Sequence, residues 1–310
     1  MTSLVTGATG FIGSYLVESL CARGESVVAL RRAGDSQATS NLRWVLGNLL
    51  DDTRMVQLMV DVRPDVIYHL AAQSYPGESW KDPQQTFHVN VTGTLNLLNA
   101  VRAAQIRPRI VIAGSSAEYR ATDDETPINE NHHLEPSSPY GVSKLAVTHL
   151  GRLFAKHYGM QILRARPFFL IGPRKVGDVC SDFARRIVTA EHAGVSVLSV
   201  GNLEVVRDLL DVRDGVRGFM QIADHGHAGE IYNICSGQGC RLRDILDEFK
   251  AMARVPLTEV FDSSLLRPIN EKTLIGDSKK LCSLGWHPER NIHNTLQDIL
   301  EFWRGAGQSK

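Results

Sequence analysis

Short apolar runs alternate with longer amphipathic stretches along the first half of this chain. The runs predict strands at residues 3–6, 26–30, 44–46, 65–70, 109–113 and 161–166, and the amphipathic stretches predict helices from 11 to about 23, at 82–104 and at 140–157. The run at 65–70 is apolar on both faces, which is typical of a central parallel strand. Strands that alternate with helices predict an α/β fold built on a doubly wound parallel sheet with right-handed connections.

The pattern becomes less regular after Pro167. We expect a loop at 168–174, a helix at 179–193, an extended segment at 205–211, a strand at 231–234, a helix at 242–252, a turn at 267–268 and a terminal helix at 295–303. No repeat or low-complexity linker separates these parts. We therefore predict a larger domain from 1–166 and about 208–235, and a smaller, discontinuous C-terminal lobe from about 167–207 and 236–310.

Composition and charge narrow the classes of partner. The chain has 310 residues, 43% hydrophobic, and its 34 Lys and Arg equal its 34 Asp and Glu. Balanced charge gives no basic field for nucleic acid or anionic lipid. No apolar run approaches the roughly 20 residues of a spanning helix, and the first strand starts too close to Met1 for a signal peptide. We expect neither nucleic acid nor membrane as partner, and a cytoplasmic location.

The cysteines point to no special chemistry. They are odd in number and scattered, without Cys-x-x-Cys spacing: Cys21, Cys180, Cys235, Cys240 and Cys282. Neither a disulfide framework nor a metal site is predicted.

A glycine-rich turn joins the first strand to the first helix. Gly7, Gly10 and Gly13 have the Gly-x-x-Gly-x-x-Gly spacing of a dinucleotide-binding turn, with Phe11 and Ile12 inside it. Such glycines permit a tight turn, close backbone approach to a pyrophosphate and close packing of helix on strand. A glycine-rich turn without a ligand is the alternative. The strand-to-helix context favours a Rossmann-type cofactor site.

Residues at the ends of the following strands indicate which cofactor binds. Arg31 and Arg32 end the second strand, where an NAD-binding protein usually has an acidic residue against the ribose 2′-hydroxyl. Two guanidinium groups suit a 2′-phosphate, so NADP(H) is favoured and NAD(H) is possible, the alternative being two solvated arginines. The other predicted cofactor contacts are Asn48 and Leu49 toward the adenine, and the small-residue strand end Leu70, Ala71 and Ala72 toward the nicotinamide.

A Tyr and a Lys four residues apart begin the helix at 140–157. One helical turn separates Tyr140 from Lys144, so both side chains leave the same face. The ammonium group is expected to lower the pKa of Tyr140, which could then exchange a proton with a sugar hydroxyl or a ketone oxygen. Ser115 or Ser116, at a strand end, could polarise the same oxygen, or both could be plain turn residues. Asn90, polar on an apolar stripe, could shape the site or bond a backbone carbonyl.

With the glycine turn, the serine pair and Tyr140/Lys144 in this order, the whole chain resembles the extended short-chain dehydrogenase/reductase superfamily. Within it, the stretches 87–95, 138–144, 201–208, 232–237 and 266–268 are most similar to the GDP-4-keto-6-deoxy-D-mannose reductases, which form GDP-D-rhamnose. The resemblance implies that Tyr140 donates a proton, that Lys144 orients the nicotinamide ribose and tunes Tyr140, and that Ser115 bonds the sugar oxygen. It also implies a homodimer through the helices at 82–104 and 140–157.

The resemblance further implies a nucleotide-sugar site in the smaller lobe. Arg207 and Arg267 match positions that clamp a nucleotide diphosphate, a task that suits bidentate guanidinium. The full set of predicted substrate-binding residues is Gln73, Asn90, Ser116, Phe169, Arg174, Arg207 and Arg267.

Two departures from the superfamily pattern bear on the reaction. Dehydratases carry a Glu two residues before the Tyr that is here Tyr119; Ala117 takes that place, and Glu118 is one position off. Dehydration is therefore disfavoured. Phe169 stands where reductases and dehydratases commonly have an Asn that bonds the substrate, which leaves the exact sugar open.

The predicted function is NADPH-dependent reduction of the C4 ketone of a nucleotide-linked 4-keto-6-deoxy sugar, with GDP-4-keto-6-deoxy-D-mannose as the favoured substrate. One alternative is a nucleotide-sugar 4-epimerase, which uses the same residues with tightly bound NAD. A second is a non-catalytic dinucleotide-sensing protein.

Overall fold

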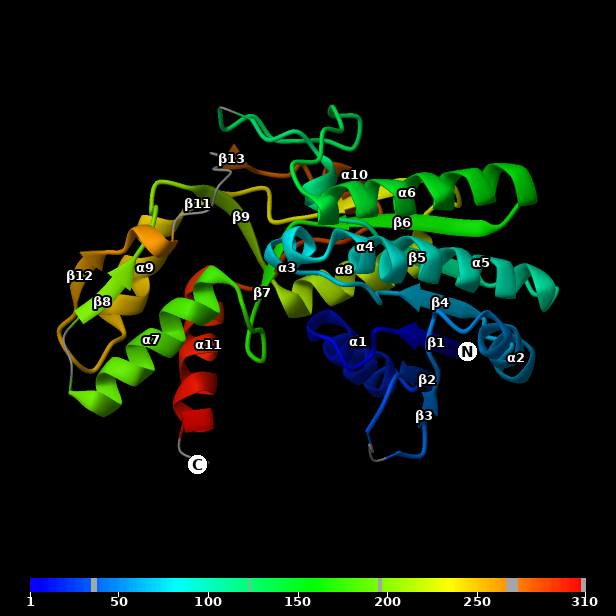
Figure 1. Cartoon of the computed structure of the whole chain (residues 1–310), viewed down its shortest axis with the longest axis horizontal. Helices are drawn as coiled ribbons and strands as arrows, with labels where there is room; N and C mark the ends of the chain where they lie inside the picture. The colour runs from blue at the N-terminus through cyan, green and yellow to red at the C-terminus, as the bar shows by residue number, and fades with distance from the viewer. Residues whose placement is uncertain (35–37, 123, 195–196, 266–272, 308–310) are drawn as a thin grey trace.

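A computed structural model describes residues 1–34, 38–122, 124–194, 197–265 and 273–307 (Figure 1). Its main sheet has seven strands, all parallel, in the order β10-β6-β5-β4-β1-β2-β3. The strands are β1 (Thr2–Thr6), β2 (Ser26–Arg31), β3 (Leu42–Leu46), β4 (Val66–His69), β5 (Arg109–Ala113), β6 (Gln161–Pro167) and β10 (Ile231–Ile234). The order reverses between β1 and β4, and open α/β sheets bind ligands at the carboxyl ends of the strands where such a reversal occurs. The predicted doubly wound parallel sheet is confirmed.

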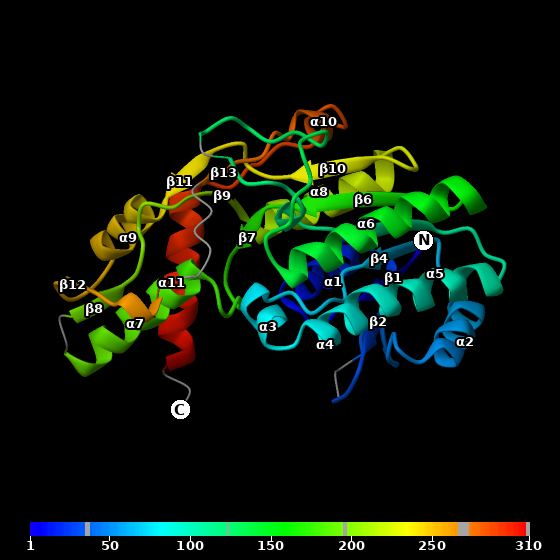
Figure 2. The same ribbon diagram turned by 45° about the horizontal axis from the view of Figure 1, so that its top comes forward.

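Helices cover both faces of this sheet, as Figure 2 shows. One face packs against α1 (Phe11–Ala22) and α8 (Val212–His225), and the other against α2 (Asp52–Val62), α5 (Gly93–Ala103) and α6 (Pro139–Tyr158). Successive strand residues point to opposite faces, so neighbours along a strand join different cores. Val111, for example, packs with α1 and α8, whereas Ile110 and Ile112 pack with α2, α5 and α6.

A smaller lobe lies beside the carboxyl ends of the sheet (Figure 1). It contains α7 (Val179–Ala193), β8 (Val197–Val200), α9 (Leu242–Ala251), β12 (Thr258–Phe261) and α11 (Ile292–Gly307). These helices share one apolar core, which includes Phe183, Leu246, Phe249, Leu296 and Ile299. The predicted smaller lobe therefore has its own core, and small sheets separate from the main sheet accompany it.

A four-stranded sheet connects the part of the chain around the main sheet to the smaller lobe. It contains β7 (Phe169–Ile171), β9 (Val206–Asp211), β11 (Gly239–Arg241) and β13 (Thr273–Leu274), with β9 pairing with the other three. β9 spans the predicted boundary at 207/208. The exact division of the chain at 166/167, 207/208 and 235/236 stays a proposal.

Some elements differ from the sequence-based expectation. β7 replaces part of a predicted loop, and α2 and α8 were not predicted. Gly215 and Gly218 weaken the helical pattern of α8 in the sequence. They allow close packing, because a Cβ at Gly215 would come within 2.7 Å of a Leu170 methyl group and one at Gly218 within 3.0 Å of an Ile234 methyl group.

The helix predicted at 82–104 is interrupted. α3 (Pro76–Lys81) and α4 (Pro83–Phe87) precede a π-helical turn, η1 (His88–Thr92), which leads directly into α5. Such π-turns often occur at functional sites, because the extra residue redirects side chains. Here the turn carries Asn90.

Candidate active site

The glycine turn forms a cradle at the carboxyl end of β1. Gly7 has φ of +70°, and the N–H of Gly10 donates to the carbonyl of Gly7 over 2.9 Å. A Cβ at Gly7 would come within 2.7 Å of the Ala71 nitrogen, and one at Gly13 would overlap the Gly7 carbonyl oxygen. Only glycine fits at either position.

The N-terminus of α1 is open to an anion. Gly10 is the N-cap and has no side chain to cover the first N–H groups, while Phe11 and Ile12, both half-buried, fill the first turn. These N–H groups and the helix dipole favour a negatively charged group. The cradle and the open helix end fit a dinucleotide pyrophosphate.

The other predicted cofactor residues lie at neighbouring strand ends. Arg31 is half-buried, with its guanidinium 5.9 Å from the centroid of the Trp44 ring, and Arg32 is exposed. Asn48 is exposed and its side chain accepts from the Leu50 N–H over 3.1 Å, whereas Leu49 is buried. Two cationic side chains thus lie at the end of β2, on the same edge of the sheet as the cradle.

Ser115, Tyr140 and Lys144 are brought together at the ends of β5 and α6. All three are at least nine-tenths buried, and the Ser115 side chain lies close enough to the Tyr140 hydroxyl to affect its pKa. The Lys144 ammonium donates to the carbonyl of Ala113 over 2.8 Å. Ser138 caps α6 by accepting from the Gly141 N–H over 3.1 Å, which fixes where the helix begins and which face Tyr140 occupies.

Burial dominates the electrostatics of this group. It raises the pKa of Tyr140 to about 12, against the opposing effect of the Ser115 side chain. Burial also lowers the pKa of Lys144 to about 8, with Glu118 opposing. The expectation of a lowered Tyr140 pKa is therefore wrong for the chain alone, because desolvation of the phenolate outweighs the effect of Ser115 and the charge of Glu118 raises the pKa further. Tyr140 is protonated at neutral pH, the state that a proton donor needs.

Asn90 connects the cofactor side of the site to α6. It is buried in the π-turn, and its side-chain oxygen accepts from the Gln73 N–H over 2.7 Å. Its amide group donates to the Gln73 carbonyl over 3.1 Å and to the Ser143 hydroxyl over 2.9 Å. Asn90 thus bonds backbone and shapes the site, and it fixes Gln73 close to the helix that carries Tyr140.

Sequence reasoning did not identify His69, at the end of β4, as part of this network. Its Nδ1 lies 2.8 Å from the Thr6 hydroxyl and its Nε2 lies 2.9 Å from the Thr94 hydroxyl. Thr94 donates its own proton to the Asn90 carbonyl over 2.6 Å, so it accepts from Nε2–H, and Nδ1 accepts from Thr6. His69 is therefore neutral, and full burial, reinforced by the charge of Lys144, lowers its pKa to about 3.

This depressed pKa makes folding sensitive to acid. Below pH 6.5 the unfolded chain binds a proton at His69 that the folded chain refuses, so stability is lost as pH falls from 6.5 toward 3. Between pH 7 and 5 we expect a loss of about 2 kcal/mol from this one group. Urea titration measures it, with His69→Gln as the variant that should lose this part of the pH dependence. Titration of the His69 ring by NMR between pH 7 and 5 would contradict the assignment.

From the sequence, Glu118 was recognised only as a carboxylate one position away from that of the dehydratase base. It ends the short helix η2 (Ser116–Glu118), is fully buried, and accepts from the Arg166 guanidinium over 2.8 Å. A carboxylate sealed in this way cannot reach a bound sugar. Its nearest sequence signal is Gly114, where a Cβ would overlap the Glu118 carboxylate.

The predicted substrate residues are only partly brought together. The Arg207 guanidinium lies 5.3 Å from the centroid of the Phe169 ring, and Ser116 is buried in η2. Arg174 is exposed and contacts α1 instead, pairing with Glu18 over 2.5 Å and covering the Tyr15 ring at 4.4 Å. Arg267 lies outside the described residues.

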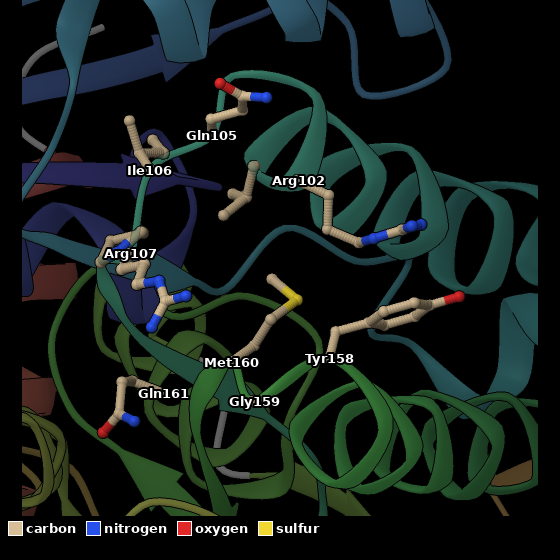
Figure 3. Close-up of a pocket in the computed structure, with 10 residues that line it drawn as sticks. Arg102, Gln105, Ile106, Arg107, Tyr158, Gly159, Met160 and Gln161 are labelled. Atoms are coloured by element: carbon tan, nitrogen blue, oxygen red, sulfur yellow. The ribbon is translucent and has the colours of Figure 1, made fainter.

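The hollow shown in Figure 3 lies away from the predicted substrate residues. It has a volume of about 350 Å³ and lies where α5 and α6 end and β5 and β6 begin, with the Arg102 guanidinium 3.7 Å from the Tyr158 ring centroid. This is the edge of the sheet opposite Tyr140. Within the described residues, no group of His, Cys, Asp and Glu side chains could hold a metal ion, and no helix is long and apolar enough to cross a membrane.

Comparisons with known proteins agree with this geometry. Residues 4–299 match the family model described as GDP-mannose 4,6 dehydratase. GDP-6-deoxy-D-mannose reductase from Pseudomonas aeruginosa is 32% identical over 309 residues, which cover 96% of each chain.

Two solved structures are similar over almost their whole length. The structure of RMD from Pseudomonas aeruginosa complexed with NADPH has a TM-score of 0.87 and 32% identity, covering 98% of this chain and 99% of that one. UDP-glucose 4-epimerase from Thermotoga maritima, with UDP-glucose, has a TM-score of 0.90 and 25% identity, covering 99% of both. The chain therefore belongs to the GDP-mannose 4,6 dehydratase family of extended short-chain dehydrogenases/reductases, and it is an NAD(P)-dependent enzyme that acts on nucleotide sugars.

Proposed function

We propose that this enzyme reduces the C4 ketone of a nucleotide-linked 4-keto-6-deoxy sugar with NADPH, and that the substrate is GDP-4-keto-6-deoxy-D-mannose. The observation that carries the proposal is the state of two side chains. Tyr140 is protonated and lies beside Ser115, whereas Glu118 is sealed in an ion pair with Arg166. The site thus has a proton donor for a ketone oxygen, and the carboxylate one position from the dehydratase base is out of reach. The similarity to GDP-6-deoxy-D-mannose reductase supports the choice of sugar.

The chain's own residues account for positioning and proton transfer. Ser115 donates a hydrogen bond to the C4 oxygen, and Tyr140 gives that oxygen its proton as the negative charge develops. Lys144, one turn along α6, stabilises the phenolate that remains, which regains a proton from water. When bound, the nicotinamide cofactor supplies the hydride. The product is the C4 alcohol, either GDP-6-deoxy-D-mannose (GDP-D-rhamnose) or its C4 epimer.

The binding residues divide between the two reactants. The Gly7–Gly13 turn holds the cofactor pyrophosphate, and Arg31 and Arg32 favour the 2′-phosphate of NADPH over NADH. Arg207, supported on the Phe169 ring, binds the nucleotide diphosphate. Phe169 in place of an amide offers this support instead of a hydrogen bond to the sugar. The cytoplasmic location stays a prediction.

Incubation with NADPH or NADH and GDP-4-keto-6-deoxy-D-mannose tests the proposal, with dTDP-, UDP- and CDP-linked analogues in parallel. We expect loss of NADPH absorbance in step with loss of the GDP-linked ketone, and NMR of the product then gives the configuration at C4. The second candidate, a nucleotide-sugar 4-epimerase, is favoured by the similarity to UDP-glucose 4-epimerase. Stoichiometric bound NAD and interconversion of UDP-sugars without NADPH consumption would replace our proposal with it. A non-catalytic sensing protein is not carried further, because the family is one of enzymes.

We also propose a homodimer formed through the segment 82–104, which contains α4 and α5, and through α6. Exposed apolar side chains occur along α6 and the helix before the π-turn, namely Phe87, Val142, Leu153 and Tyr158. Packing these against a second copy would remove them from water. We expect light scattering to give about twice the 34.3 kDa chain mass, and Leu153→Asp to shift it toward the monomer. A monomer mass for the natural chain at micromolar concentration would contradict the dimer.

A further inference from the structure

We propose that Glu118 is a positioning residue of this active site, which ties the Ser115 turn to helix α6 and keeps the Lys144 ammonium charged. The inference rests on the proposed roles of Ser115, Tyr140 and Lys144, but not on the identity of the sugar. Glu118 touches none of the reacting atoms, so its action is through these three residues.

One oxygen of Glu118 links the turn to the helix. Oε1 accepts from the Ser115 N–H over 2.9 Å and from the Thr148 hydroxyl over 2.9 Å. Tyr140, Lys144 and Thr148 follow each other at intervals of four residues, so they form one stripe along α6. The carboxylate therefore fixes the distance between Ser115 and the stripe that carries Tyr140 and Lys144.

The other oxygen is fixed by Arg166, on β6. Arg166 Nε donates to Glu118 Oε2 over 2.8 Å, and only 3% of the Arg166 side chain and none of the Glu118 side chain is exposed. The guanidinium also covers the Tyr119 ring at 4.5 Å, and the Tyr119 hydroxyl donates to Asn233 over 2.8 Å. Every oxygen of the buried carboxylate is thus satisfied, which is the condition for keeping a buried charge.

Two glycines create the space for this contact. A Cβ at Gly114 would overlap Glu118 Oε1 and come within 3.0 Å of the Thr148 hydroxyl. A Cβ at Gly141 would overlap the Ala117 carbonyl and come within 2.9 Å of Pro136. The turn and the helix therefore approach closely at both glycines, and at Gly114 there is no room for a displaced carboxylate.

Burial raises the pKa of Glu118, whereas the Arg166 cation and the hydrogen bonds to the carboxylate favour its charged form, and this charge acts on Lys144. The titratable groups that face Lys144 are Glu118 from η2, His69 from β4 and Tyr140 one turn earlier on α6; His69 and Tyr140 are neutral at pH 7. Burial lowers the pKa of Lys144, and the attraction of Glu118 opposes this. Without the carboxylate, Lys144 would lose its proton at a lower pH and the Arg166 cation would lose its buried partner.

The experiment compares Glu118→Gln with the natural enzyme by two readouts. The first is the titration of Lys144, followed by NMR of 13Cε-labelled lysine and assigned by the signal that Lys144→Arg loses; it needs neither substrate nor activity. The second is the pH profile of kcat. We expect Lys144 to titrate about one pH unit lower in Glu118→Gln, the alkaline limb of kcat to move with it, and kcat at neutral pH to fall on the order of tenfold.

Three controls separate positioning from general stability. Glu191→Gln breaks a largely buried, though less fully buried, pair in the other lobe, where Glu191 accepts from Arg304 and from the Arg254 N–H; it should move neither readout. Thr148→Val and Glu118→Asp keep the charge but loosen the link, so we expect lower kcat with unchanged Lys144 titration. If Glu118→Gln does not fold, Glu118→Asp and Thr148→Val still decide the positioning role.

An unchanged Lys144 titration in Glu118→Gln would overturn the charge role, and full kcat in both Glu118→Asp and Thr148→Val would overturn the positioning role. Equal effects of Glu191→Gln and Glu118→Gln on the pH profile would reduce Glu118 to a structural residue. If the natural enzyme reduces none of the keto sugars, the proposed function fails separately, while the Lys144 titration still tests Glu118.

Discussion

Replacing Tyr140 with phenylalanine lowers kcat by about 10²- to 10⁴-fold, because the ring stays but the proton for the C4 oxygen is lost. Tyr140 contacts the sugar oxygen in our proposal, whereas the cofactor is held by the glycine turn and Lys144. We therefore expect NADPH binding to change little. Stopped-flow measurement of NADPH oxidation with the keto sugar, beside fluorescence titration of NADPH, separates the two effects.

Tyr119→Phe is the matched control for this variant. Tyr119 is equally buried close to the site, and its hydroxyl donates to Asn233 rather than facing the Tyr140–Lys144 side of α6. Loss of that bond should cost about 1 kcal/mol of stability and leave kcat nearly unchanged. If Tyr140→Phe keeps most of its kcat, another group supplies the proton and the proposed mechanism is wrong.

The same groups set the pH dependence of the natural enzyme. Tyr140, with a pKa of about 12, stays protonated throughout the working range. Lys144, with a pKa of about 8, does not. The alkaline limb of kcat should therefore reflect Lys144, which connects the experiments on Glu118 and on Tyr140 through one titrating group.

Local sequence patterns predicted the fold, and the spacing of Tyr140 and Lys144, together with the glycine turn and the serine pair, led to the choice of these two residues. Alternating runs specify a parallel sheet, and side chains four residues apart share a helix face whatever the rest of the chain does. By contrast, α8 was missed because its glycines look unfavourable until Leu170 and Ile234 pack against them. A single sequence does not show whether a glycine that weakens a helix locally also allows close packing in the folded chain.

The electrostatics of the site depend on contacts between distant segments. The direction of the shift in the Tyr140 pKa was predicted wrongly. The prediction used only the nearby Lys144 charge, whereas burial, a property of the folded chain, has the largest effect. Glu118 meets its partner Arg166 across 48 residues, and Arg174 is engaged by Glu18 across 156. Neither pairing leaves a local pattern. The nearest sequence signal for the Glu118 contact is Gly114, a small residue before two serines.

Gly13→Ala should have the second large effect, on cofactor binding. The new Cβ would overlap the Gly7 carbonyl and lie 2.9 Å from Ala8 Cα, so the turn that cradles the pyrophosphate must move. Overpacking of this kind costs about 1–3 kcal/mol, and when the displaced groups are those that bind the cofactor, we expect NADPH affinity to fall on the order of 100-fold. Fluorescence titration with NADPH measures the change directly.

Gly305→Ala tests whether the loss comes from the position rather than from the added methyl group. Gly305 is exposed on α11, and a Cβ there meets nothing within 4 Å in the described part of the chain. Alanine favours a helix by up to about 1 kcal/mol over glycine, so this variant should be slightly more stable and bind NADPH like the natural enzyme. The backbone at Gly13 can host a Cβ only if Gly7 gives way, and Gly7 already lies against Ala71. Unchanged NADPH affinity in Gly13→Ala would therefore mean that the cofactor does not use this turn.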